Sequence, residues 1–82
     1  MNRQEWLQYL KDHKDKFKWF FDQYFEPATW DILMLYIEKE NINGIFTILN
    51  NVWFYLPDNK FNIIENPPGW NEFIYLLEEF PE

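Results

Sequence analysis

The chain lacks cysteine and serine altogether and contains a single histidine, His13. Without cysteine it has no disulfides and no thiolate metal ligands, as is usual in a reducing compartment. Only Thr29 and Thr47 carry aliphatic hydroxyls, so an acyl-enzyme mechanism has almost no nucleophile to start from. His13 falls on the apolar stripe of a predicted helix, where we expect a structural role. The sequence therefore predicts a protein that is not an enzyme and that holds no metal or cofactor.

Glycine and long apolar runs are also scarce. Gly44 and Gly69 are too far apart to form a phosphate-binding loop. The acidic pair Glu78 and Glu79 falls at a predicted helix end, where solvent keeps carboxylates from acquiring the separated pKa values that catalysis needs. The longest apolar run covers residues 32–37, whereas a membrane span needs about 20 residues. No signal-peptide pattern follows the N-terminus, so we expect a cytoplasmic protein.

Aromatic residues, by contrast, are abundant: five Trp, five Tyr and nine Phe in 82 residues. At about 150–250 Å² each, these rings could occupy roughly 3,000–4,700 Å² of buried surface. Area scaling gives a chain of this mass a total burial of about 9,600 Å², much of it backbone. A core this small cannot hide every ring. Exposed aromatic clusters are enriched where proteins meet partners.

The net charge is −7 and is unevenly distributed. Residues 1–20 carry +2, whereas residues 21–82 carry −9. A field of this sign disfavours nucleic acids and anionic membranes as partners and favours a basic protein surface. The alternative is that the charge serves only solubility, because this magnitude is ordinary for a small domain.

Apolar spacing predicts a mainly α, single-domain protein folded as a small bundle of three to four helices. The expected helices cover residues 3–24, 27–40, 44 to about 55, and 68–79. Asn2 followed by Glu5 matches a capping box at the first start, and Pro27 suits the first turn of the second helix. We expect the polar residues 11–16 to loosen or break the first helix, and residues 41–44 to form a turn. Residues 53–64 remain open between helix, a short β-hairpin and an extended loop.

Short length, acidity, missing catalytic groups and a composition rich in Asn, Ile and Lys resemble the small inhibitors that phages make against host or defence enzymes, anti-CRISPR proteins among them. The resemblance concerns the general character of the whole chain and carries over no site residue. It implies an inhibitor or adaptor that occupies a basic surface of a nucleic-acid-processing or defence enzyme. Two alternatives stay open: a self-associating assembly module, and an immunity or antitoxin-type protein.

The residues themselves indicate where a partner would bind. Surplus rings near the end of the third helix and uncompensated acids in the last eighteen residues are the candidates. The predicted partner-binding residues are Trp53, Tyr55, Glu65, Trp70, Glu72, Glu78 and Glu79.

Overall fold

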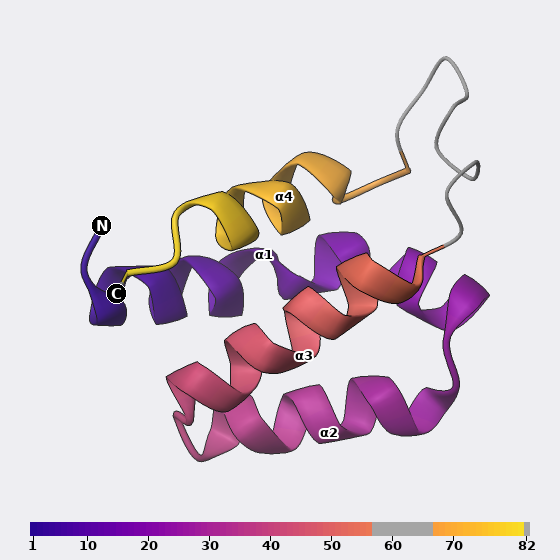
Figure 1. The fold of residues 1–82 in the computed structure, drawn as a ribbon, viewed down its shortest axis with the longest axis horizontal. Coiled ribbons are helices and arrows are strands. Elements are labelled where there is room, and N and C mark those ends of the chain that lie inside the picture. Colours follow the sequence, from indigo (N-terminus) through magenta and orange to yellow (C-terminus); the bar gives the residue numbers. More distant parts are fainter. Residues whose placement is uncertain (57–66, 82) are drawn as a thin grey trace.

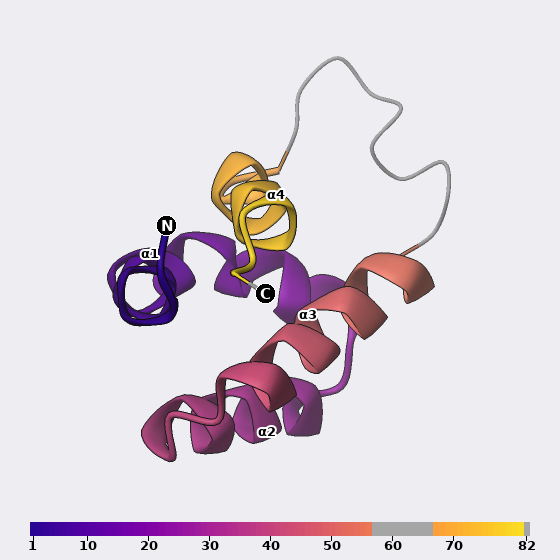
Figure 2. The ribbon, with the colours of Figure 1, turned by 60° about the vertical axis from the view of Figure 1, so that its left-hand side comes forward.

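The computed structural model describes residues 1–56 and 67–81, which form four helices (Figure 1). These are α1 (Arg3–Tyr24), α2 (Pro27–Glu38), α3 (Ile42–Tyr55) and α4 (Trp70–Glu78). Each helix runs antiparallel to the one before it; α4 lies on α1 and α3 lies beside α2 (Figures 1 and 2). α1 packs against α2 and α4, and α3 packs against the same two helices. The described residues contain no strand, which confirms the predicted small helical bundle.

The start of α1 is fixed by the predicted capping box. The Asn2 side chain accepts a hydrogen bond from the Glu5 amide at 2.8 Å, and the Asn2 amide donates to the Glu5 carboxylate at 3.1 Å. These two bonds satisfy amide groups that have no partner within the helix.

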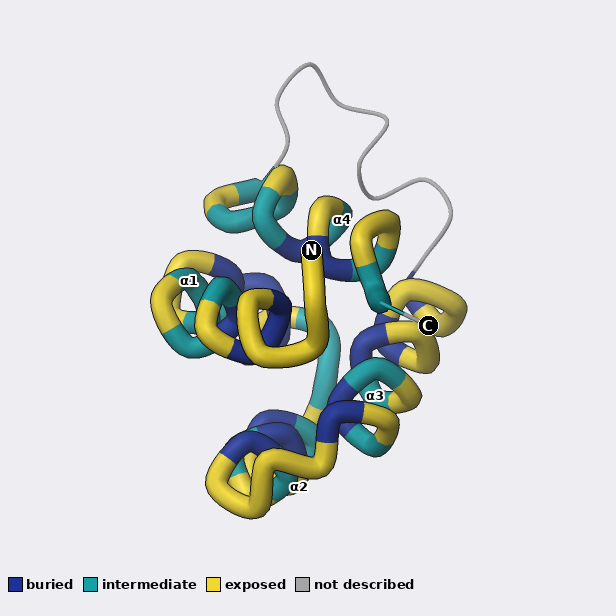
Figure 3. The backbone as a smooth tube through the Cα atoms, turned by 90° about the vertical axis from the view of Figure 1, so that its left-hand side faces the viewer, coloured by how far each residue is buried: buried dark blue, intermediate teal, exposed yellow. Residues whose placement is uncertain are grey.

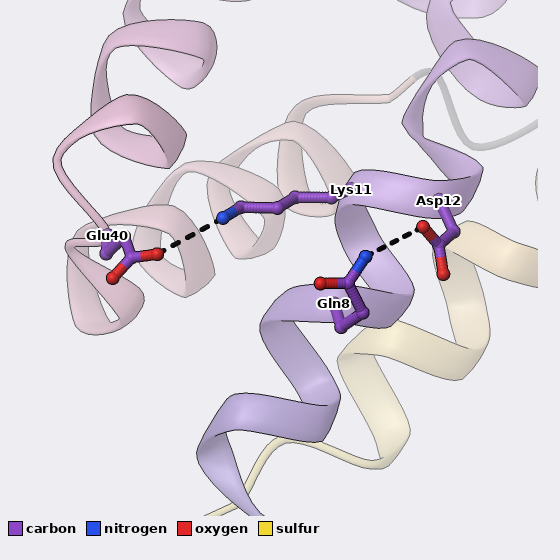
Figure 4. Close-up of polar contacts among 4 residues, drawn as sticks. All are labelled: Gln8, Lys11, Asp12 and Glu40. Atoms are coloured by element: carbon purple, nitrogen blue, oxygen red, sulfur yellow. Dashed lines mark hydrogen bonds and ion pairs between the residues drawn. The ribbon is translucent and has the colours of Figure 1, made fainter.

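The expected break within residues 11–16 is wrong, because α1 is continuous to Tyr24. A side-chain pair one turn apart supports this polar stretch: Gln8 donates to Asp12 at 2.8 Å (Figure 4). Lys11 also reaches across to Glu40, at the turn after α2, with a nitrogen–oxygen distance of 3.1 Å. Because Leu10 before this stretch and Phe17 after it are both fully buried, packing keeps the helix continuous through it.

The connection between α2 and α3 is tighter than the expected turn over residues 41–44. The amides of Glu40 and Asn41 donate to the carbonyls of Ile37 and Tyr36 at 3.0 and 2.9 Å, which is the Schellman pattern of a helix end. The Asn41 side chain then accepts from the Gly44 amide at 3.0 Å and caps α3. α2 therefore ends two residues earlier than predicted, and α3 begins two residues earlier.

α3 continues through Trp53 and Tyr55, so the hairpin alternative is wrong for these residues. The remainder of the predicted hairpin or loop segment falls at residues 57–64, outside the described residues. α4 begins at Trp70, two residues after the predicted start, because Gly69 adopts a left-handed conformation with φ 78°.

The core is formed by apolar side chains from all four helices, and Figure 3 shows the buried stretches facing inward. Within it, Phe17, Phe20, Phe21 and Phe73 pack ring against ring, with centroid separations of 5.2–6.3 Å. The fully buried Trp6 donates its indole N–H to the Leu76 carbonyl at 2.8 Å and so joins the start of α1 to the end of α4. None of the described helices is both long and apolar enough to cross a membrane.

Candidate functional site

The last turn of α3 presents three consecutive aromatic residues to solvent, which we call the α3 tip: Trp53, Phe54 and Tyr55. Their exposed fractions are 47%, 76% and 70%. Val52 and Leu56 on either side are buried, so the helix is anchored while its outer surface stays uncovered. The Phe54 and Tyr55 rings contact each other edge to face at 5.4 Å. A contiguous group of exposed rings is typical of a site that meets another molecule.

The five tryptophans divide between core and surface. Trp6 and Trp30 are buried, whereas Trp19 and Trp53 are each 47% exposed. Trp70 is half-buried and lies between the core and the α3 tip: its ring centroid is 5.9 Å from that of Phe73 and 5.7 Å from that of Trp53. Trp70 therefore supports Trp53 from below and couples the tip to the core.

Two clefts flank the α3 tip. The α2–α3 groove, of about 240 Å³, is mainly apolar and is lined by Ile32, Ile48, Val52 and Tyr55 among others. The α3–α4 cleft has a similar volume, about 240 Å³, and is lined by Asn50, Trp53, Ile74, Leu77 and Glu78. The two clefts thus differ in chemistry, since only the second includes a carboxylate.

α3 contains no Asp, Glu, Lys, Arg or His over its whole length. Its outward positions are instead taken by amides and a hydroxyl, at Asn43, Thr47, Asn50 and Asn51, followed by Phe54. Charged residues are depleted at the centres of protein interfaces because their desolvation is unfavourable, and aromatic residues are enriched there. The outer face of α3 therefore has the composition of an interface centre.

Acidic residues lie beside this uncharged face. Among the described residues, Glu78 and Glu79 have no ion-pair partner, and both are exposed. They stand at the C-terminal end of α4, whose last turn contains no base. Because a helix C-terminus carries partial negative charge, carboxylates there oppose helix stability by about 0.3–1 kcal/mol. The carboxylates of Glu78 and Glu79 therefore do not stabilise the fold.

The structure separates the other predicted site residues from this group. Glu72 lies 3.7 Å from the Lys16 ammonium and joins α1 to α4, so its carboxylate is engaged within the protein. Glu65 lies outside the described residues. The structure brings together Trp53 and Trp70 and places Glu78 in the cleft that Trp53 lines, whereas Tyr55 lines the α2–α3 groove on the other side of α3.

Phe54 was missed by the sequence analysis, although it is the most exposed large hydrophobic residue in the described part of the chain. The available signal was the absence of charge from residue 41 to residue 57. Amide side chains along one side of a helix indicate that this side is exposed. When such a helix has no charged residue over its whole length, its exposed face is polar but uncharged.

The single histidine, His13, and the half-buried phenol of Tyr9 lie side by side on α1. His13 is half-buried, stacks on the Tyr9 ring at 4.0 Å and donates from Nδ1 to the Tyr9 carbonyl at 2.7 Å, which is a structural role. Burial, with smaller contributions from Glu72 and Tyr75, raises the pKa of the Tyr9 phenol above its ordinary value. Across residues 1–56 and 67–81, no three metal-ligating side chains converge.

No protein-family model matches the chain, and neither a curated protein nor a solved structure is similar to it.

Proposed function

We propose that this protein is a binding module that docks the α3 tip onto a protein partner with a basic surface, as an inhibitor or adaptor. The observation that carries the proposal is the α3 tip itself: three exposed rings, 47–76% accessible, on a helix without a single charge. Burying such a face against a partner removes apolar area from water without desolvating any charge. The half-buried Trp70 beneath Trp53 holds the tip in place before binding.

The charge of the molecule supports a basic partner. The net charge is −7, and Glu78 and Glu79, at the end of α4 that lies away from the tip, are among the acids without an ion pair in the described part of the chain. An uncharged aromatic centre with acids farther along the neighbouring helix suits a partner whose contact surface has an apolar pocket with Lys and Arg to one side. Enzymes that process nucleic acids present such surfaces, and carboxylates can stand where phosphates would bind. A nucleic-acid-processing or defence enzyme is therefore the partner class that we propose.

The test is capture of a partner by protein carrying a photo-crosslinking residue in place of Phe54. We expect a covalent product with one partner, whose yield falls at least tenfold in the Trp53→Ala background, because hot-spot rings contribute most of the binding energy. The yield should also fall as salt rises from 0.05 to about 0.5 M, because screening weakens electrostatic steering.

Trp19→Ala provides the matched control, since Trp19 has the same exposed fraction, 47%, but lies on α1 and packs its ring against Tyr24. Trp19→Ala should leave the yield unchanged. If Trp19→Ala and Trp53→Ala reduced the crosslinking yield equally, or if no crosslinked product formed, the α3 tip would not be the binding surface.

Self-association is the second candidate, favoured by the exposed apolar side chains of α2. Ile32 and Leu35 are 47% and 44% exposed, and Ile32 also lines the α2–α3 groove, which ends at Tyr55. A second copy covering this groove would bury α2 and the tip together. Light scattering after size exclusion separates the two candidates, because self-association requires a dimer at tens of micromolar protein whereas the binding-module proposal requires an available monomer.

A further inference from the structure

We propose that the α3–α4 cleft is an anchor site for one arginine side chain of the partner. This inference rests on the proposed function, to which it adds the chemistry of the central contact. The cleft holds an exposed indole, two aliphatic side chains, an amide and a carboxylate, contributed by Trp53, Ile74, Leu77, Asn50 and Glu78. Its volume of about 240 Å³ greatly exceeds the roughly 10–15 Å³ that a single water needs.

The cleft has an aromatic end and a carboxylate end. α3 and α4 run antiparallel (Figure 1), and Trp53 contacts Trp70 at the first residue of α4. Glu78 is the last residue of α4, so it lies towards the other end of the cleft. Asn50, one turn before Trp53 on α3, lines the same cleft between these ends. Ile74 and Leu77, which lie between Trp70 and Glu78 on α4, also line the cleft.

This order of groups matches a long side chain with an apolar stem and a cationic head. The stem packs on Ile74 and Leu77, while the head meets the Glu78 carboxylate and the Asn50 amide oxygen, both of which accept hydrogen bonds. A guanidinium suits the site better than an ammonium. Its planar fork donates to two acceptors at once, whereas an ammonium is a point charge. The apolar stem, which leads back from the head, passes the Trp53 indole at the other end of the cleft.

The charge of the site supports a cationic occupant. Glu78 has no ion-pair partner among the described residues, and its position at the end of α4 opposes the helix dipole. A bound guanidinium would supply the missing positive charge both to the carboxylate and to the helix end. Glu79 shares the helix end but does not line the cleft, which makes it a matched control.

The experiment follows the indole N–H signals by two-dimensional NMR during titration with Nα-acetyl-arginine N-methylamide at constant ionic strength. Trp53→Phe identifies the Trp53 signal. We expect this signal to shift saturably with a Kd on the order of tens of millimolar, since one exposed ion pair and the packing of one apolar stem bind weakly. Glu78→Gln should weaken binding at least threefold, whereas Glu79→Gln should change it less than 1.5-fold. Both variants should fold, because each removes a charge that opposes the helix dipole.

Two further ligands test the assignment to arginine. The citrulline analogue keeps the shape but loses the charge, and should leave the Trp53 signal unshifted; the lysine analogue should bind at least threefold more weakly than the arginine compound. Equal shifts with citrulline or with lysine, or equal effects of the two Gln variants, would overturn the arginine site. The titration needs no partner protein, so its result is independent of the crosslinking experiment at Phe54. A negative titration would exclude the arginine site, whereas the crosslinking experiment would still decide whether the α3 tip binds a partner.

Discussion

At the scale of single residues, Glu40 occupies a position that glycine usually takes. Its φ is 54°, and it closes the Schellman pattern at the end of α2. Residues with a Cβ are strained in this conformation by about 1–2 kcal/mol. The Glu40 side chain partly offsets the strain through its contact with Lys11, although exposed ion pairs contribute only about 0–1 kcal/mol.

We therefore predict that Glu40→Gly is more stable than Glu40→Ala by about 1 kcal/mol. Both variants lose the Lys11 contact, so the difference between them reports the left-handed backbone alone. At Asp31, an exposed position within α2, the order should reverse, with Gly about 1 kcal/mol less stable than Ala. Urea unfolding of the four variants measures both differences, and the same order at the two positions would contradict the strain at Glu40.

Tyr9 makes the stability of the fold sensitive to alkaline pH. Burial raises the pKa of its phenol above the ordinary value near 10, so the folded state holds this proton more tightly than the unfolded state. The corresponding stability is fully present below pH 10 and is lost as the pH rises through the raised pKa. We predict that Tyr9→Phe gains stability relative to the parent protein between pH 8 and pH 11.

Chemical unfolding at several pH values measures this effect. Tyr55→Phe is the control, because it removes a phenol that is 70% exposed. A difference between the Tyr9→Phe and parent proteins that stays constant with pH would show that burial of Tyr9 does not shift its titration.

At the scale of helices, α4 depends on the glycine before it. A Cβ at Gly69 would overlap the Lys16 carbonyl and the Phe17 amide nitrogen on α1, and φ at this position is 78°. We predict that Gly69→Ala destabilises the protein by at least about 2 kcal/mol, since strain and displacement of α4 add together. Asn71→Ala, an exposed change within α4, should change stability by less than about 0.5 kcal/mol. Equal unfolding midpoints for the two variants would contradict the close approach of Gly69 to α1.

The helices themselves could be predicted from the sequence because their signals are local. Asn2 with Glu5 marked the start of α1, and apolar spacing marked the inner faces. The predicted end of α2 and the predicted start of α3 were each wrong by two residues. The reason is that Glu40 adopts a left-handed conformation, which sequence rules expect of glycine and not of glutamate. The break expected in α1 was wrong because buried Leu10 and Phe17 outweigh a polar stretch of six residues.

The candidate site could be predicted only in part. Trp53 and Tyr55 were expected to meet a partner, and both are exposed, but the exposure of Phe54 depends on how far α3 extends past the buried Val52. Glu72 carried the same sequence signal as Glu78, yet its contact with Lys16 comes from the packing of α4 on α1. Such long-range pairing is set by the tertiary fold and has no local signature.

At the scale of the whole molecule, net charge and exposed apolar surface oppose each other. Copies of the chain repel one another through a net charge of −7, whereas the α3 tip and the exposed Ile32 and Leu35 of α2 favour association. Screening reaches about 10 Å at 0.1 M salt and about 3 Å at 1 M salt, so salt removes the repulsion and leaves the apolar attraction.

We predict a monomer at 0.1 M salt and weak, reversible self-association at 1 M salt, measured by sedimentation equilibrium. Replacing Phe54 and Leu35 by Gln should abolish the association, because both side chains are exposed and their loss removes apolar contact area without disturbing the core. Replacing Asn71 by Gln serves as the control and should leave the association unchanged. A dimer that persists at 0.1 M salt on dilution to nanomolar protein would mean that the exposed apolar surface is already occupied by a second copy, and the self-association candidate would then replace the partner-binding proposal.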